Sequence, residues 1–391
     1  MDFSEKVSRF SLNVGIVKET YTGERRVALT PTSIPPLKKA GFHVTVESGS
    51  GRQAGYADEE YADKGAEIAV ERAAVFQAAD ILLQVRGLGA NLPAGEKDLD
   101  LLRRDQIVIG LLEPMSEPEA LKMLADRGVT AFALELIPRI TRAQNMDVLS
   151  SMATVAGYKA VLLAAEALPR MFPLLMTAAG TIAPAKVFVV GAGVAGLQAI
   201  ATARRLGALV SAYDVRAAVR EQVQSLGAKF VELPMEAADA ETAGGYAREL
   251  GESFYRRQRE MMLKVVAESD VVITTAAVPG RKAPLLVTGE MVQRMQPGSL
   301  ILDLAAERGG NCELTKPGET VVEHGVTIMG PLNLASTVPY HASQMYAKNI
   351  TNFLLHLCKD GKPRLDEEDE IIRSTLVTRG GNVVLKSEGV G

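Results

Sequence analysis

The most informative chemical motif in the sequence is a run of glycines that follows a short apolar segment. Lys186–Val190 (KVFVV) leads into GAGVAG, which has the spacing G-x-G-x-x-G. Gly191 would permit a tight turn, Gly193 would let a pyrophosphate approach the backbone, and Gly196 would let a helix pack closely on the sheet. Free N–H groups at the start of that helix would bind phosphate. The candidate nucleotide-binding residues of this turn are Gly191, Ala192, Gly193, Val194 and Gly196.

An acidic residue follows at the distance expected for contact with the ribose of a dinucleotide. Asp214 lies 214 − 191 = 23 residues after the first glycine, close to the usual spacing of about 20. Its carboxylate would accept hydrogen bonds from the ribose hydroxyls and repel a 2′-phosphate, which favours NAD(H) over NADP(H). Arg216 leaves the opposite preference open, because a nearby arginine can accommodate that phosphate. A glycine-rich turn in a cofactor-free domain is the alternative interpretation.

Two further segments hold side chains that suit ligand binding. Arg139–Asp147 is polar and non-periodic, and it lies between an apolar strand and a long helical pattern. Binding sites favour such boundaries, although a solvated linker between domains explains the segment equally well on local grounds. Gly244-Gly245-Tyr246 predicts a hinged loop with an aromatic tip that closes over a ligand. A surface insertion is the alternative.

No clear acid–base group accompanies these motifs. His324 precedes a strand in a turn, His341 opens a late helix, and Cys312 follows a pair of glycines, so each favours a structural role. The four histidines lie far apart and form no HExxH motif, so we expect no structural metal site. Gly49–Gly55 has the spacing G-x-G-x-x-x-G without a following helical pattern, and we interpret it as a loop.

The elements that must position these residues alternate along the chain, and short apolar runs followed by helical patterns predict parallel sheets covered by helices. We expect helices at Glu117–Arg127 (with Ser116 as a possible N-cap and Gly128 beyond its end), Val148–Leu168 and Tyr340–Leu357. The expected strands are Leu12–Val17, His43–Glu47, Ile81–Val85, Ile107–Leu112, Thr130–Leu136, Ala185–Val190, Ala208–Tyr213, Lys229–Leu233, Val271–Thr275, Leu300–Leu304 and Val326–Met329.

Composition excludes several classes of protein. The 391 residues are 47% apolar and 23% charged with a net charge of −4, which argues against a disordered chain and against a basic nucleic-acid-binding surface. Two cysteines build no disulfide framework, which favours a reducing compartment. The longest weakly polar stretch we identify, Val187–Ala203, falls short of about 18 apolar residues. We therefore expect a cytoplasmic chain without a signal peptide or a direct membrane insertion.

Several longer motifs carry a family resemblance. ELIPRITRAQNMDVLSS, TAAGTIAPAKVFVVGAGVAGLQAIATARRLGA, YDVRAAVREQVQSLGAKF, ETAGGYAREL, ITTAAVPGRKAP and DLAAERGGNCE closely resemble the NAD(H)-binding component of proton-translocating NAD(P) transhydrogenase. VGIVKETYTGERRVALTP is similar both to that family and to its relative alanine dehydrogenase. The resemblance runs from Val14 to Leu357.

The resemblance implies an architecture and a set of partners. It implies two Rossmann-like, doubly wound α/β domains that flank a cleft, one formed by residues 1–147 plus 335–391 and the other by residues 148–334. It implies a homodimer that is peripheral to the inner membrane and docks onto separate subunits, which form the proton channel and bind NADP(H). The 13 residues before Val14 depart from the family pattern.

The resemblance also implies site residues. The Arg139–Asp147 segment would hold the nicotinamide end of NAD, Asp214 and its neighbours the adenosine ribose, and Tyr246 would be the mobile lid. The candidates for catalysis are Arg139, Gln144, Asp147 and Tyr246. The candidate cofactor-binding residues besides the glycine turn are Arg139, Ile140, Thr141, Arg142, Gln144, Asp147, Ser150, Asp214, Val215, Arg216, Gly245, Gln258 and Ala277.

The mechanism implied by the resemblance needs no general acid. Hydride would pass directly from NADH on this chain to NADP⁺ on the partner subunit, so neither carbon takes a proton during transfer. Catalysis would then consist mainly of aligning two nicotinamide rings and excluding water. Proton movement would be coupled to the redox step through the conformational cycle of the partner.

Two other functions remain open. An amino-acid dehydrogenase of the alanine dehydrogenase type would use a lysine in a K-V-K strand and a histidine after the next strand, whereas Leu83–Arg86 and Ile107–Glu113 contain neither residue. Arg26 nevertheless matches the carboxylate-binding arginine of that relative, which allows a vestigial substrate pocket, while Glu307 stands where the relative has an aspartate. A non-catalytic NAD-sensing subunit is the second alternative.

Overall fold

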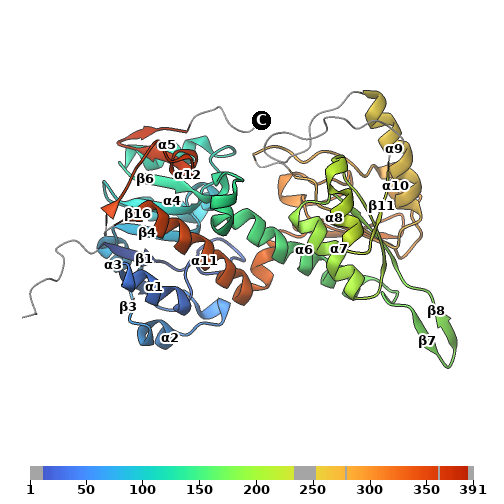
Figure 1. Ribbon diagram of the computed structural model, residues 1–391, viewed down its shortest axis with the longest axis horizontal. Coiled ribbons are helices and arrows are strands. Elements are labelled where there is room, and N and C mark those ends of the chain that lie inside the picture. Colours follow the sequence, from blue (N-terminus) through green and yellow to red (C-terminus); the bar gives the residue numbers. More distant parts are fainter. Residues whose placement is uncertain (1–11, 233–251, 278–279, 360–361, 386–391) are drawn as a thin grey trace, which may run out of the picture. The chain divides into compact units, whose positions relative to one another are not determined.

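A computed structural model describes residues 12–232, 252–277, 280–359 and 362–385. The chain divides into two compact units, and most of each unit is a parallel β-sheet covered by helices, which confirms the predicted α/β class (Figure 1). The first unit contains Met1–Met152 and Ser336–Gly389, and the second contains Ala153–Ala335. The sequence-based boundaries were 147/148 and 334/335.

The second unit has the strand order of a dinucleotide-binding domain. Its seven-stranded sheet runs β11-β10-β9-β12-β13-β15-β14, and only the edge strand β14 is antiparallel to its neighbour. Because β9 lies between β10 and β12, the direction of strand addition reverses there, which creates a ligand-binding switch point. The strands are β9 (Lys186–Val190), β10 (Leu209–Tyr213), β11 (Lys229–Phe230), β12 (Val271–Thr274), β13 (Leu300–Asp303), β14 (Thr320–Glu323) and β15 (Val326–Met329).

Both faces of this sheet are buried, which explains the continuous apolar strands of the sequence. Val187 and Val189 of β9 belong to one apolar cluster, and Phe188 and Val190 belong to another. The covering helices are α7 (Val194–Arg205), α8 (Arg220–Ser225), α9 (Glu252–Ala267), α10 (Gly289–Gln293) and the later turns of α6 (Val148–Ala167).

The first unit repeats this strand order and extends it with the end of the chain. Its sheet runs β19-β18-β6-β5-β4-β1-β2-β3, and the C-terminal strand β18 pairs antiparallel with β6. The strands are β1 (Asn13–Ile16), β2 (His43–Glu47), β3 (Glu67–Ala69), β4 (Ile81–Arg86), β5 (Ile107–Leu111), β6 (Thr130–Ala133), β18 (Leu376–Arg379) and β19 (Asn382–Val383). The helices are α1 (Ile34–Lys39), α2 (Asp58–Asp63), α3 (Arg72–Ala78), α4 (Leu92–Leu99), α5 (Pro118–Asp126), α11 (Pro339–Leu357) and α12 (Glu370–Thr375).

Three details of the sequence interpretation are wrong. The N-cap of α5 is Glu117 rather than Ser116, and no side chain caps that helix. Strand β6 ends at Ala133, because a 3-10 turn (Leu134–Leu136) follows it. Helix α6, rather than Val187–Ala203, is the long apolar stretch; in the described part of the chain it alone has the length and composition that could cross a membrane.

A two-stranded hairpin of β7 (Leu175–Thr177) and β8 (Gly180–Ile182) projects from the second unit (Figure 1). Its apolar side chains face solvent in the isolated chain, where Met176 is 84% exposed and Leu174 is 55% exposed. Exposed apolar residues on an isolated hairpin are typical of a surface that another chain covers.

Candidate functional site

The glycine turn between β9 and α7 has the backbone form that its motif predicts. Gly191 adopts a φ of +96°, which only glycine adopts readily, and Gly193 is the N-cap of α7. A Cβ on Gly196 would lie 1.9 Å from the carbonyl oxygen of Gly191, whereas a Cβ on Gly193 would meet no atom within 4 Å. Gly196 therefore serves helix packing, and the space beside Gly193 is available to a ligand.

Asp214, directly after β10, is tied both to this turn and to Arg216. Its Oδ2 accepts a hydrogen bond of 2.7 Å from the backbone N–H of Ala192. Arg216 donates to Oδ1 from Nε at 2.9 Å and to Oδ2 from Nη2 at 2.8 Å. Both carboxylate oxygens thus sit at the end of the turn where a nucleotide ribose would bind, already held by local donors.

The segment after β12 completes this edge of the sheet, and the sequence analysis missed the residues that shape it. Thr275 Oγ1 donates to the carbonyl oxygen of Gly191 at 3.0 Å. Asn311, which is fully buried, donates from Nδ2 to the carbonyls of Ala276 and Pro284 and accepts from the N–H of Ala276 at 3.0 Å. Ala277 is exposed beside them.

Asp303, at the end of β13, holds Asn311 in place. Its buried carboxylate accepts hydrogen bonds from Thr274, Thr315 and the N–H groups of Ala305, Asn311 and Cys312, all within 2.7–3.0 Å. An acid at the end of an apolar strand, followed by a glycine pair, was the available signal. Burial raises the pKa of the Cys312 thiol, and the cysteine is 2% exposed, so it has a structural role.

Other predicted residues of this unit are placed less directly. Gln258 is buried and donates to the hydroxyl of Tyr213 at 3.1 Å, so it supports the end of β10 next to Asp214. Val194 is 40% exposed at the start of α7. Gly245 and Tyr246 lie outside the described residues.

In the first unit, the polar segment predicted from the sequence forms a 3-10 helix over Thr141–Met146. Ala143 and Met146 are buried and anchor it, whereas Thr141, Arg142 and Gln144 are exposed, as is Arg139 just before it. The apolar residues thus face inward and the polar candidates face solvent, as a ligand-binding loop requires.

Asp147 joins this segment to α6. It accepts hydrogen bonds from the backbone N–H of Ser150 at 2.9 Å and from Ser150 Oγ at 2.5 Å. This pattern caps the first turn of α6. The structure therefore brings together two residues that the sequence analysis proposed separately, and it also gives Asp147 a local structural role.

The C-terminal part of the chain supports the same segment. Asn349 and Asn352 of α11 donate to the carbonyl oxygen of Asn145 at 2.8 and 3.0 Å. Asp369 pairs with Arg142 at 3.1 Å and with His356 at 2.8 Å. Although burial acts in the opposite direction, the N–H of Ile371 and these two cationic side chains lower the pKa of Asp369. No sequence pattern indicated these long-range contacts.

Arg26, which matched a carboxylate-binding residue, already binds a carboxylate of the chain. It is 4% exposed and contacts Glu24 through Nε–Oε1 and Nη2–Oε2 distances of 2.7 and 2.6 Å, while Arg86 Nε lies 3.2 Å from Oε2. Burial acts to raise the pKa of Glu24, but its hydrogen bonds and ion pair with Arg26 lower that pKa to about 2. A substrate carboxylate would have to displace Glu24.

Two other buried carboxylates of this unit follow strand ends. Glu19 accepts hydrogen bonds from the N–H groups of Val85 and Arg86, and Glu135 accepts from those of Leu112 and Glu113. Burial raises the pKa of each carboxyl to about 7. Glu135 Oε2 is buried without a hydrogen-bond partner among the described residues, which is costly for a charged oxygen.

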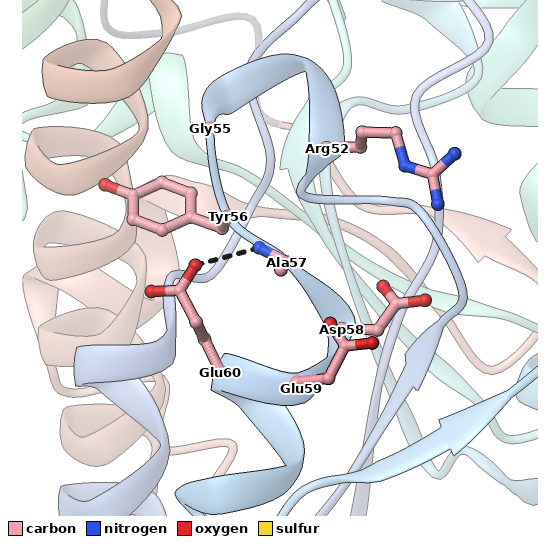
Figure 2. Close-up of a pocket in the computed structure, with 7 residues that line it drawn as sticks. All are labelled: Arg52, Gly55, Tyr56, Ala57, Asp58, Glu59 and Glu60. Atoms are coloured by element: carbon pink, nitrogen blue, oxygen red, sulfur yellow. Dashed lines mark hydrogen bonds between the residues drawn. The ribbon is translucent and has the colours of Figure 1, made fainter.

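A pocket of about 260 Å³ lies apart from these candidates, along the loop after β2 and the start of α2 (Figure 2). Its lining includes Asp58, Glu59 and Glu60, and Glu60 accepts from the N–H of Ala57. The N–H of Gly49 is already bound to Asp58. Because acids line this loop and occupy that donor, it is not a second phosphate site. Across the described ranges, no three His, Cys, Asp or Glu residues form a metal site.

Comparisons with known proteins cover almost the whole chain. Residues 15–156 match the family described as alanine dehydrogenase/PNT, N-terminal domain, and residues 160–386 match its C-terminal domain. The first of the polypeptides that make up the split alpha subunit of NAD(P) transhydrogenase in Rhodospirillum rubrum is 48% identical over 95% of this chain and 98% of that protein. A crystal structure of transhydrogenase from Sinorhizobium meliloti covers 96% of this chain and 99% of that chain, with 43% identity and a TM-score of 0.83. Alanine dehydrogenase of Bacillus subtilis is 30% identical over 96% of this chain and 93% of that protein.

Proposed function

Because the chain belongs to the alanine dehydrogenase/PNT family, we propose that it is the NAD(H)-binding subunit of a proton-translocating NAD(P) transhydrogenase. The observation that carries the proposal is the near-complete similarity to the first polypeptide of the split transhydrogenase alpha subunit. The glycine turn, the open space at Gly193 and the acid Asp214 suit the pyrophosphate and ribose of NAD.

The proposed reaction transfers hydride from NADH on this chain to NADP⁺ on a partner subunit. The bound nicotinamide supplies the hydride. Gln144, Asp147 and Arg139 orient the nicotinamide end through hydrogen bonds, and no side chain of the chain needs to exchange a proton with the reacting carbon. Their contribution is positioning, which accounts for large rate effects when two reactants must meet in one geometry.

The proposed assembly contains further subunits. We propose a homodimer, since the β7–β8 hairpin exposes Leu174 and Met176 and a second copy of this chain would cover them. Membrane-spanning and NADP(H)-binding subunits would couple hydride transfer to proton translocation, with this chain cytoplasmic and peripheral to the inner membrane. Tyr246 remains a lid candidate on sequence grounds alone.

The test is reconstitution with the NADP(H)-binding and membrane subunits. We expect reduction of an NAD⁺ analogue by NADPH, followed by absorbance, only when this chain is present. The chain alone should not oxidise NADH with pyruvate and ammonia, because Glu24 occupies Arg26. Rapid oxidation under those conditions would replace the proposal with an amino-acid dehydrogenase. NADH binding without any transfer in the complex would favour an NAD-sensing subunit.

A further inference from the structure

Two amide side chains of α11 converge on one backbone carbonyl in the Thr141–Met146 segment. Asn349 and Asn352 are three residues apart, so they lie on the same face of the helix. Their Nδ2 atoms lie 2.8 and 3.0 Å from the carbonyl oxygen of Asn145. A carbonyl oxygen has two lone pairs, so this pair of donors saturates it.

This contact fixes the peptide plane that follows Asn145. Gln144 immediately precedes that residue and Asp147 comes two positions later, so a rotation of the plane would redirect both side chains. The rest of the segment is held by the burial of Ala143 and Met146. The Arg142–Asp369 ion pair adds little to this rigidity, because half of the Arg142 side chain is exposed.

We propose that Asn349 and Asn352 are positioning residues that hold Gln144 and Asp147 in the orientation needed for hydride transfer. The inference rests on the proposed function. It assigns a role in the reaction to the C-terminal part of the chain, which lies more than 200 residues from the segment it supports, since the Asn349–Asn145 separation is 204 residues.

The sharpest variant is Asn352→Asp, because aspartate has the same shape but no donor. Asn352 is only half-buried, so the variant should fold. Lys348→Ala is the matched control, since it lies on the same helix, is exposed and changes the net charge by the same one unit. Asn352→Gln restores an amide donor and should recover part of the lost activity.

In the reconstituted complex, we expect kcat of Asn352→Asp to fall by about 3- to 10-fold, the effect of one lost hydrogen bond. The dissociation constant for NADH should change by less than about 2-fold, and Lys348→Ala should match the wild type. Wild-type kcat in Asn352→Asp would overturn the inference. So would an equal loss of kcat in Asn352→Gln and Asn352→Asp, because a purely structural role ignores the donor.

A second measurement separates this inference from the proposed function. Amide hydrogen exchange of the isolated chain reports the rigidity of residues 141–147 without any partner subunit. We expect about 10-fold faster exchange in this segment in Asn352→Asp and unchanged exchange in Lys348→Ala. Unchanged exchange in Asn352→Asp would refute the anchoring role. A wild-type complex that transfers no hydride would refute the function while leaving the anchoring result valid.

Discussion

The guanidinium of Arg216 and the carboxylate of Asp214 form a two-point ion pair, with Nε–Oδ1 and Nη2–Oδ2 distances of 2.9 and 2.8 Å. The acid that would recognise the ribose of NAD is therefore partly neutralised before any nucleotide binds. Arg216 also stands where a 2′-phosphate would need a cation. Together, the two residues would set the choice between NAD(H) and NADP(H).

Replacing Asp214 by alanine should weaken NADH binding by about 10- to 100-fold, the loss of one or two hydrogen bonds to a charged group. The preference for NADH over NADPH should fall at the same time, because the repulsion of the 2′-phosphate disappears. Titration calorimetry with both nucleotides measures the two effects. Unchanged NADH affinity would refute the ribose assignment.

Replacing Arg216 by alanine should act in the opposite direction on selectivity. The unpaired Asp214 carboxylate would repel the 2′-phosphate more strongly, so the dissociation constant for NADPH should rise by about 10-fold or more relative to that for NADH. Arg220→Ala removes an exposed arginine nearby, which pairs with Glu232, and should leave the ratio unchanged. A ratio that stays constant in both variants would show that Arg216 has no part in selectivity.

Two glycines of the turn should respond differently to alanine. Gly193→Ala places a Cβ in open space, so the variant should fold with a normal melting temperature and lose most of its NADH affinity. Gly196→Ala forces a Cβ to 1.9 Å from the carbonyl of Gly191, so it should lower the melting temperature by several degrees. Thermal unfolding and NADH titration of both variants provide the test. Normal NADH affinity in Gly193→Ala would place the pyrophosphate elsewhere.

The exposed Gln144 should affect rate rather than stability. Gln144→Ala should lower kcat of the reconstituted complex by about 10-fold or more, with a small effect on NADH binding, if its amide orients the nicotinamide. Asp147→Asn should slow the reaction similarly. Because Asp147 also caps α6 through Ser150, its melting temperature must be measured in parallel. Full turnover in both variants would reduce the segment to a linker.

Buried carboxyls of the first unit should make stability depend on pH. Burial raises the pKa of Glu135 to about 7 from an ordinary value of 4.5, so the folded state binds a proton more tightly than the unfolded state. Its contribution is complete below about pH 4.5 and is lost as the pH rises through 7. Glu19 acts with the same sign.

Glu135→Gln mimics the protonated acid and should test this directly. We expect its melting temperature to exceed that of the wild type at pH 8 and to match it at pH 4.5, as followed by circular dichroism. Identical melting temperatures at both pH values would show that Glu135 ionises at its ordinary pKa.

Local sequence signals were sufficient for the nucleotide-binding turn and for most strands of both sheets. Gly191, Gly193 and Gly196 could be assigned because backbone geometry at a strand–helix turn depends on neighbouring residues alone. The apolar runs identified the strands because both sheet faces are buried. Helix α5 shows the limit of such signals, since Ser116 has the chemistry of an N-cap but does not occupy that position.

The surroundings of the candidate residues were decided by tertiary structure. Asn349 and Asn352 reach Asn145 from a helix 204 residues away, and Asn311 reaches Ala276 from another strand–loop segment. Polar side chains of this kind take their partners from whichever backbone groups the packed elements bring near them. Hydrogen-bonding capacity is a property of each residue, whereas the distance between two such groups is a property of the folded chain, so sequence alone identified the binding chemistry and only the fold showed what holds it in place.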